Sequence, residues 1–151
     1  NLGMGNENGT CYFTDMDQDD RNQIRPENKD GKAIPVEVKT LDEVTAGEEH
    51  IDLLKVDVEG YEKYVFQGAQ AALAKSRMVY YESCEKNYQD FGYSGDEVDN
   101  MIRSAGFEIF SIEDENTLTP LPEQTTERKT RNLLALKDPD AFTRQTGMKI
   151  R

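Results

Sequence analysis

The clearest pattern in the chain is a short apolar run that ends in two carboxylates and a glycine. The run reads Ile51-Asp-Leu-Leu-Lys-Val-Asp-Val-Glu-Gly60, and a segment with helical spacing of apolar residues follows it. A parallel strand buried inside a sheet has this character, because its polar groups lie only where it emerges. Ligands of open α/β sheets bind at the carboxyl ends of the strands. Asp57 and Glu59 are therefore predicted to lie at a functional edge of a sheet.

Helical and extended segments alternate after this strand. In chain order, the pattern predicts a helix over 60–73, a strand over 77–82, a helix over 94–105, and strands over 107–112 and 132–136. The second helix begins with a capping box formed by Ser94 and Glu97, and it ends at Gly106. A helix lies in the connection between the first two strands, so those strands are predicted to be parallel. The order β-α-β-α-β-β predicts an α/β domain.

The first fifty residues are less regular than the rest. The pattern predicts a strand end over 1–4, a turn over 5–9 and a strand over 10–14. Residues 34–38 alternate in polarity but contain Pro35, so they predict at best an edge strand. Thr40 and Glu43 match a further capping box, which predicts a short helix that extends to about Ala46.

Three polar segments are predicted to lie outside regular structure. They are the loops 15–32 and 113–130 and a C-terminal tail over 138–151. The loop 113–130 leads into the last strand at the ligand side of the sheet and is long enough to be functional. The length of 151 residues fits a single domain with one core.

The chain is acidic, with a formal net charge of −12 and 32% charged residues. This charge disfavours nucleic acid and anionic membranes as partners, because both reward lysine and arginine. No window approaches the roughly 18 consecutive apolar residues that a membrane span requires. Cys11 and Cys84 provide no disulfide framework, so a reduced, cytoplasmic setting is expected.

An ordered set of motifs resembles the FkbM family of S-adenosylmethionine-dependent methyltransferases. The central motif is Lys55-Val-Asp-Val-Glu-Gly60, followed by Val65-Phe-Gln-Gly-Ala69 and then by Tyr81-Glu82. Further matching segments are 5–9, 38–42, 105–107 and 132–135. The resemblance covers essentially the whole chain.

This resemblance implies a class I methyltransferase-like, or Rossmann-like, sheet whose last strand is antiparallel. It also implies that S-adenosylmethionine is the cofactor and that a methyl group passes to a hydroxyl. The implied acceptor is a small molecule or glycan, often a sugar or a complex natural product. The final pair of predicted strands agrees with such a sheet.

The chain departs from the family pattern in one respect. No Gly-x-Gly turn after a strand occurs in the 151 residues, so the first strands and the glycine-rich cofactor turn are expected upstream of Asn1. Gly3 and Asp57 are the candidate cofactor-binding residues, although Gly3 precedes a turn and cannot replace the missing motif. We expect residues 1–151 to be a partial methyltransferase domain that is inactive alone. Its strand over 51–58 would then have an unpaired edge that favours self-association.

Asp57, Glu59 and Glu82 are the candidate catalytic residues. Asp57 could orient or deprotonate an acceptor hydroxyl, and Glu82 leaves the next strand at the same edge. Alternatively, Asp57 or Glu59 caps the following helix, and Glu82 is a solvated carboxylate. A non-catalytic remnant or interaction module with the same fold is the alternative for the whole chain.

Other candidate side chains carry less information. Tyr88, Phe91 and Tyr93 follow the Glu82 strand and could stack on an acceptor or cover the core. His50 precedes the central strand, at the end opposite to the carboxylates, and Cys84 is expected to be a small, partly buried residue. The sequence therefore does not support a metal site built on histidine or cysteine.

Overall fold

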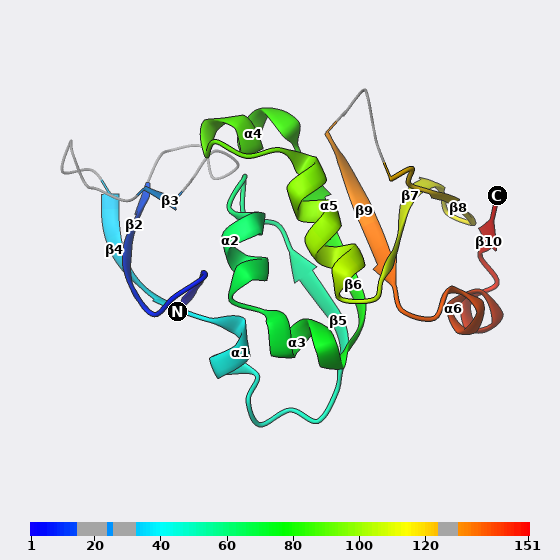
Figure 1. Ribbon diagram of the computed structural model, residues 1–151, viewed down its shortest axis with the longest axis horizontal. Helices are drawn as coiled ribbons and strands as arrows, with labels where there is room; N and C mark the ends of the chain where they lie inside the picture. The colour runs from blue at the N-terminus through cyan, green and yellow to red at the C-terminus, as the bar shows by residue number, and fades with distance from the viewer. Residues whose placement is uncertain (15–23, 26–32, 124–129) are drawn as a thin grey trace.

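The computed structural model describes residues 1–14, 24–25, 33–123 and 130–151, which form a mixed α/β fold. A four-stranded sheet lies at one end of the molecule and a six-stranded sheet occupies the rest (Figure 1). Much of the predicted loop 15–32 and the segment 124–129 lie outside the described residues. No helix in the described ranges is long and apolar enough to cross a membrane.

The six-stranded sheet has the order β10-β8-β7-β9-β6-β5. Its strands are β5 (Ile51–Val56), β6 (Ser76–Ser83), β7 (Glu108–Asp114), β8 (Thr117–Pro120), β9 (Arg131–Leu136) and β10 (Lys149–Ile150). β5 and β6 are parallel, as predicted. β9 is antiparallel to both β6 and β7, so β7 runs in the same direction as β6.

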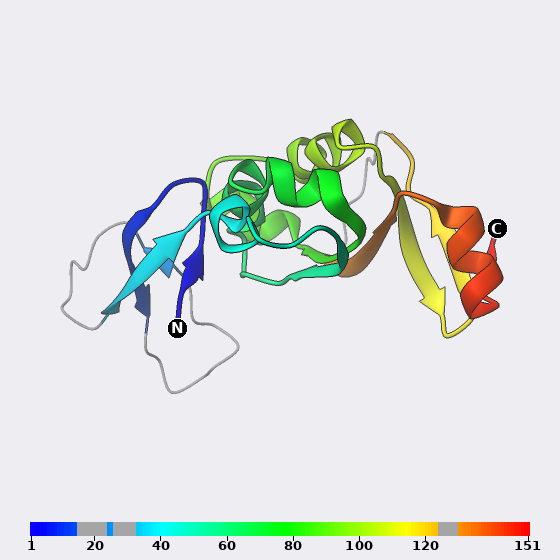
Figure 2. The same ribbon diagram turned by 90° about the horizontal axis from the view of Figure 1, so that it is seen from below.

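Helices cover one face of this sheet around β5, β6 and β9 (Figure 2). They are α2 (Glu62–Gln67), α3 (Gln70–Lys75), α4 (Glu85–Asp90) and α5 (Gly95–Ser104). Together with inward-facing side chains of the strands they form the main core, in which Phe66, Tyr81 and Tyr88 are fully buried. The capping box of α5 is confirmed, since Ser94 and Glu97 bond each other's backbone N–H groups.

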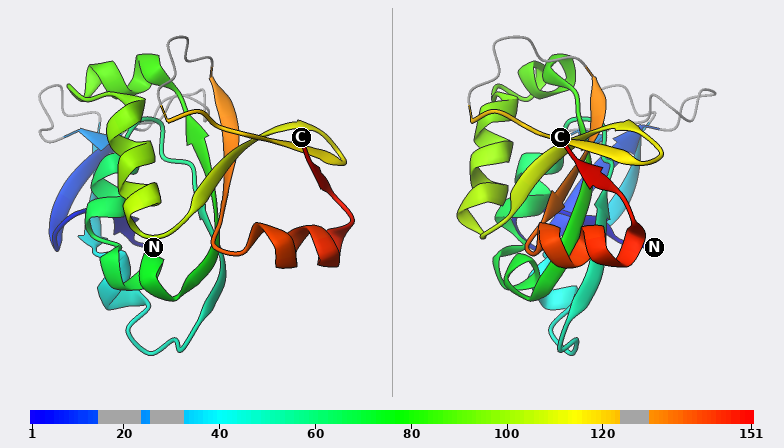
Figure 3. Two further views of the ribbon diagram at one scale, coloured as in Figure 1. Left: turned by 45° about the vertical axis from the view of Figure 1, so that its right-hand side comes forward. Right: turned by 90° about the vertical axis from the view of Figure 1, so that its right-hand side faces the viewer.

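The other face of the sheet is covered near its far end by α6 (Pro139–Thr146), as Figure 3 shows. Leu133 and Ala135 of β9 belong to the main core, whereas Leu134 and Leu136 face a second cluster that includes Phe142 of α6. This alternation follows from the two-residue period of a strand. The predicted C-terminal tail 138–151 therefore contains a helix and a short strand.

The four-stranded sheet has the order β1-β4-β2-β3. Its strands are β1 (Gly3–Met4), β2 (Gly9–Thr14), β3 (Ile24–Arg25) and β4 (Ala33–Lys39). β4 lies between β1 and β2 in this order, so the strand as a whole is internal, but the predicted edge is found at Pro35 itself. Among the residues that the structure describes, β1 pairs only with Val38 and Lys39, so β4 has a single neighbour at Pro35 and the sheet accommodates the missing N–H.

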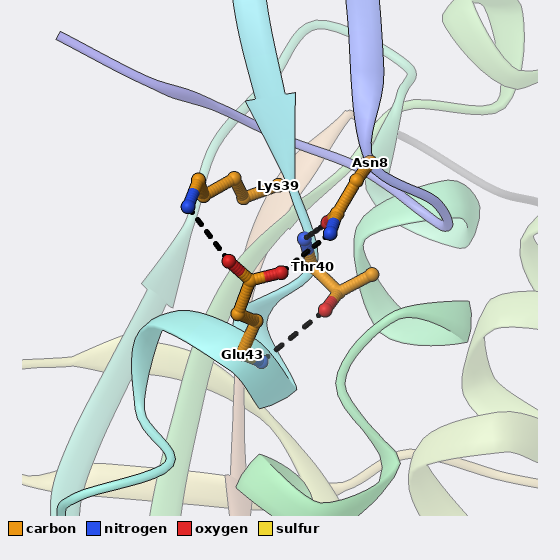
Figure 4. Close-up of polar contacts among 4 residues, drawn as sticks. All are labelled: Asn8, Lys39, Thr40 and Glu43. Carbon is orange, nitrogen blue, oxygen red and sulfur yellow. Dashed lines mark hydrogen bonds and ion pairs between the residues drawn. The ribbon is translucent and has the colours of Figure 1, made fainter.

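The helix α1 (Leu41–Val44) connects the two sheets and has only half of its predicted capping box. The Thr40 hydroxyl accepts from the Glu43 N–H at 3.2 Å, as expected. The Glu43 carboxylate does not return this bond: it pairs with Lys39 at 2.6 Å and accepts from Asn8, whose own oxygen accepts from the Thr40 N–H (Figure 4). A residue from the connection between β1 and β2 thus completes the cap.

The predicted helix over 60–73 is divided into α2 and α3 at Gly68 and Ala69. A Cβ atom at Gly68 would lie 2.1 Å from the carbonyl oxygen of Gly5. The connection between β1 and β2 therefore passes close to this break, and glycine is required for the contact. The periodicity of the segment does not reveal a contact with residues more than sixty positions away.

Two further predictions need correction. β5 is not buried on both faces: it lies at the end of the sheet, and Leu53 is 50% exposed. Within the described residues β5 pairs only with β6, so its other edge is open. The predicted polar loop 113–130 contains β8, which forms a hairpin with β7. Leu118 of β8 is fully buried in the second cluster, and this burial stabilises the hairpin.

Candidate functional site

The carboxyl end of β5 turns sharply into α2 through residues 57–60. Glu59 has a φ of +51° and Gly60 a φ of +98°, so two consecutive residues adopt left-handed backbone conformations. A Cβ atom at Gly60 would lie 2.9 Å from both the Cβ atom and the carbonyl oxygen of Asn87. Glycine is therefore required at position 60 by its φ and by the close approach of α4.

This turn and the end of β6 bring three carboxylates together. One oxygen atom from each of Asp57, Glu59 and Glu82 lies within 4.8 Å of the other two. Asp57 is exposed, and the other two residues are half-buried. β5 and β6 are adjacent and parallel, so their carboxyl ends meet at one edge of the sheet. The structure thus gathers the three residues that the sequence singles out for catalysis, while their roles stay predictions.

Neighbouring side chains fix two of these carboxylates. The Lys55 ammonium forms an ion pair with Asp57 at 3.1 Å, and the Asn87 amide donates to Glu59 at 3.1 Å. Burial raises the pKa of Glu82, and the negative charges of Glu59 and Asp57 raise it further. Glu82 therefore holds a proton more strongly than an ordinary glutamate, which suits a group that receives one.

Within the described residues, Asp57 bonds Lys55 and Glu59 bonds Asn87 rather than a backbone N–H of α2, so the helix-capping interpretation rests on their charge alone. α2 has no side-chain hydrogen bond at its N-cap residue, Tyr61. The carboxylate that bonds the backbone of the turn is instead that of Glu62, whose Oε1 accepts from the Val58 N–H at 3.1 Å. Sequence reasoning missed Glu62 because a glutamate in the first turn of a helix is usually solvated.

An open hollow of about 640 Å³ adjoins the carboxylates. Its lining is mainly apolar and comes from the four-stranded sheet and from the turn after β5. Both candidate cofactor-binding residues, Gly3 and Asp57, line it, together with Glu59. A Cβ atom at Gly3 would approach Val38 to 3.3 Å, so a larger residue would crowd this wall. The hollow and its acidic rim could accommodate a ligand with an apolar part and a positively charged or hydroxyl-bearing part.

The same three carboxylates are close enough to share a cation. Carboxylate oxygens are the ligands that Mg²⁺ and Ca²⁺ prefer. Acidic groups near a surface also gather without a metal, so this spacing alone does not assign one.

The aromatic residues after β6 serve mainly the core. Tyr88 and Tyr93 are buried and stacked on each other, with ring centroids 4.9 Å apart, whereas Phe91 is only partly buried. The Tyr93 hydroxyl donates to the carbonyl oxygen of Gly60 and so reaches the turn. Of the two sequence interpretations, core packing therefore applies to Tyr88 and Tyr93.

The two remaining candidate residues, His50 and Cys84, are not part of the carboxylate cluster. His50 is exposed and directly precedes β5, at the end of the strand opposite to Asp57. Cys84 is buried, and its sulfur accepts a hydrogen bond from the Thr130 hydroxyl at 3.2 Å. Both placements agree with the structural roles expected of these residues.

Comparison with protein families gives one match. The methyltransferase FkbM domain matches residues 2–109, a range that contains the turn after β5, all three carboxylates and every lining residue of the hollow except Asn1. Searches of curated proteins and of solved structures found no match.

Proposed function

We propose that this chain, which belongs to the FkbM methyltransferase domain family, is built for S-adenosylmethionine-dependent methylation of a hydroxyl on a sugar or natural-product acceptor. The observation that carries the proposal is the gathering of Asp57, Glu59 and Glu82 at the carboxyl ends of two parallel strands. Ligands of open α/β sheets bind at this edge. The antiparallel strand β9 between β6 and β7 supports a class I, Rossmann-like sheet.

In this proposal the carboxylates handle the acceptor proton. S-adenosylmethionine would supply an electrophilic methyl group, and the acceptor oxygen would form the new bond to carbon as the bond to sulfur breaks. Asp57 orients the acceptor hydroxyl or takes its proton, and Glu82 is the second group able to hold that proton. Asn87 fixes Glu59 at the rim, where its negative charge favours a cationic ligand.

Gly3 and Asp57 would contact the cofactor from two walls of the hollow. The described residues supply apolar surface for an adenosyl group and negative charge for a sulfonium. The 151 residues contain no glycine-rich turn between a strand and a helix. We therefore propose that they do not methylate by themselves. The same observation favours a second candidate, a non-catalytic interaction module that retains the fold.

Calorimetric titration of S-adenosylhomocysteine into the 151-residue chain and into the product of the complete gene tests this proposal. Binding by the complete product alone would support an enzyme whose cofactor site needs more than these residues. Asp57→Asn in that product should then lower methyl transfer to an accepted hydroxyl substrate by about 100-fold or more, the usual range for acid–base groups. Failure of the complete product to bind would refute the methyltransferase proposal and favour the interaction module.

The remaining proposals concern the cellular location of the protein and its binding partners. The net charge of −12 argues against nucleic acid and anionic membranes as partners, and the two cysteines, which form no disulfide, suit the cytoplasm. The open edge of β5 supports self-association, because unpaired N–H and C=O groups can pair with a second chain.

A further inference from the structure

Glu62 is a buried carboxyl group that the proposed reaction does not use. It lies in the first turn of α2, and its exposed fraction is 0%. Its Oε1 accepts from the Val58 N–H at 3.1 Å, while its Oε2 has no hydrogen-bond partner within the described part of the chain. Burying a carboxyl group with an unsatisfied oxygen costs free energy, and an apolar residue would avoid this cost. The bond to Val58 ties this side chain to the turn, which an apolar side chain could not do.

The turn that Glu62 contacts depends on its surroundings. Glu59 and Gly60 both have left-handed φ angles, and such a conformation is unfavourable at a glutamate. Tyr93 binds the carbonyl oxygen of Gly60, and Asn87 binds the side chain of Glu59. These contacts hold the end of the turn, whereas Glu62 holds its beginning. Glu59 lies between these contacts, and Asp57 directly precedes Val58.

We propose that Glu62 is a positioning residue, whose carboxyl group fixes the backbone of the Asp57–Gly60 turn and thereby holds Asp57 and Glu59 beside Glu82. The significance of this role for catalysis rests on the proposed methyltransferase function. The positioning itself concerns only the turn and needs neither cofactor nor acceptor. An ionised carboxylate accepts a stronger hydrogen bond than a neutral carboxyl group. The strength of the hydrogen bond from the Val58 N–H therefore depends on the charge of Glu62.

The surroundings of Glu62 place its ionisation in the neutral range. Burial raises its pKa to about 7, against the lowering effect of backbone N–H groups that include its own, and Glu82 on β6 adds a smaller increase. The hydroxyl-bearing rings of Tyr88 on α4 and Tyr93 also face it, and their pKa values are raised mainly by burial. The hydrogen bond from the Val58 N–H to Glu62 should therefore hold the turn more firmly above pH 7 than below it.

Nuclear magnetic resonance of the ¹⁵N-labelled 151-residue chain tests this role. The chemical shift of the Val58 amide is followed from pH 5.5 to 8.5 in the wild type, Glu62→Gln and Glu62→Leu, together with amide hydrogen exchange. In the wild type this shift should titrate with a midpoint near 7. Glu62→Gln should abolish the titration but keep the amide protected, since its oxygen still accepts. Glu62→Leu should lower protection of the Val58 amide by about tenfold, the effect of losing one hydrogen bond, while amides in β9 stay protected.

A control variant separates Glu62 from its neighbour. In Glu82→Gln the titration of the Val58 amide should survive. The proposal is overturned if the titration persists in Glu62→Gln, or if Glu62→Leu protects Val58 as the wild type does. Should Glu62→Leu fail to fold, the comparison of wild type with Glu62→Gln still decides. Because no cofactor enters this experiment, its outcome is independent of the titration that tests the methyltransferase proposal.

Discussion

Replacement of Glu62 by glutamine measures the free-energy cost of a charge inside the main core. The side chain is 0% exposed, and its pKa rises from the ordinary 4.5 to about 7 on folding. A group whose pKa is raised on folding contributes stability that is present below pH 4.5 and is lost as the pH rises through 7. This rise corresponds to about 3 kcal/mol of unfolding free energy. About 2 kcal/mol of this unfolding free energy is lost between pH 5.5 and pH 8.5.

Urea denaturation at intervals between pH 5.5 and 8.5 checks this magnitude. The difference in unfolding free energy between Glu62→Gln and the wild type should shift by about 2 kcal/mol in favour of the variant as the pH rises. Glu43→Gln is the control, because the pKa of Glu43 is lowered by Lys39 and Asn8 and its titration lies below this range. A pH-independent difference for Glu62→Gln would refute the assignment of a buried, titrating carboxyl group.

Three further predictions follow from packing and from the open strand edge. Gly68→Ala should lower the unfolding free energy measured in urea by about 1–3 kcal/mol, because its Cβ atom would lie 2.1 Å from the Gly5 carbonyl oxygen. Tyr81→Phe should lower it by about 1–3 kcal/mol, because its hydroxyl donates to the buried Asp99 at 2.7 Å. Sedimentation velocity should detect concentration-dependent self-association, which Leu53→Lys on the exposed face of β5 should reduce.

Each of these predictions has a matched control. Gly47→Ala should be nearly neutral, because no atom lies within 4 Å of the added Cβ. Tyr80→Phe, on the same strand as Tyr81 but only partly buried, should cost less than Tyr81→Phe. Ile112→Lys adds the same charge to β7, away from the β5 edge, and should leave self-association unchanged. Equal effects of variant and control would contradict the corresponding argument, and a single sedimenting species at all concentrations would contradict the last.

Local sequence patterns predict the main elements and the location of the acidic edge. Apolar runs with a two-residue or helical period predicted β5, β6, β7, β9 and α5, because these signals depend only on neighbouring residues. The capping box at Ser94 is local for the same reason. Asp57 and Glu59 could be placed at a strand end from their order alone. The motifs also identified the family, which the match over residues 2–109 confirmed.

Features that depend on residues distant in the chain follow from the packing of the folded molecule. Contact with Gly5 divides the predicted long helix at Gly68. The sequence predicts the open edge of β5, but it does not predict the exposure of Leu53. The pairing of β5 with β6 brings Glu82 to the other two carboxylates. Glu62 is buried near Tyr88 and Tyr93, although its sequence position resembles that of a solvated helix residue. Burial and proximity are set by packing between elements, which local periodicity does not encode.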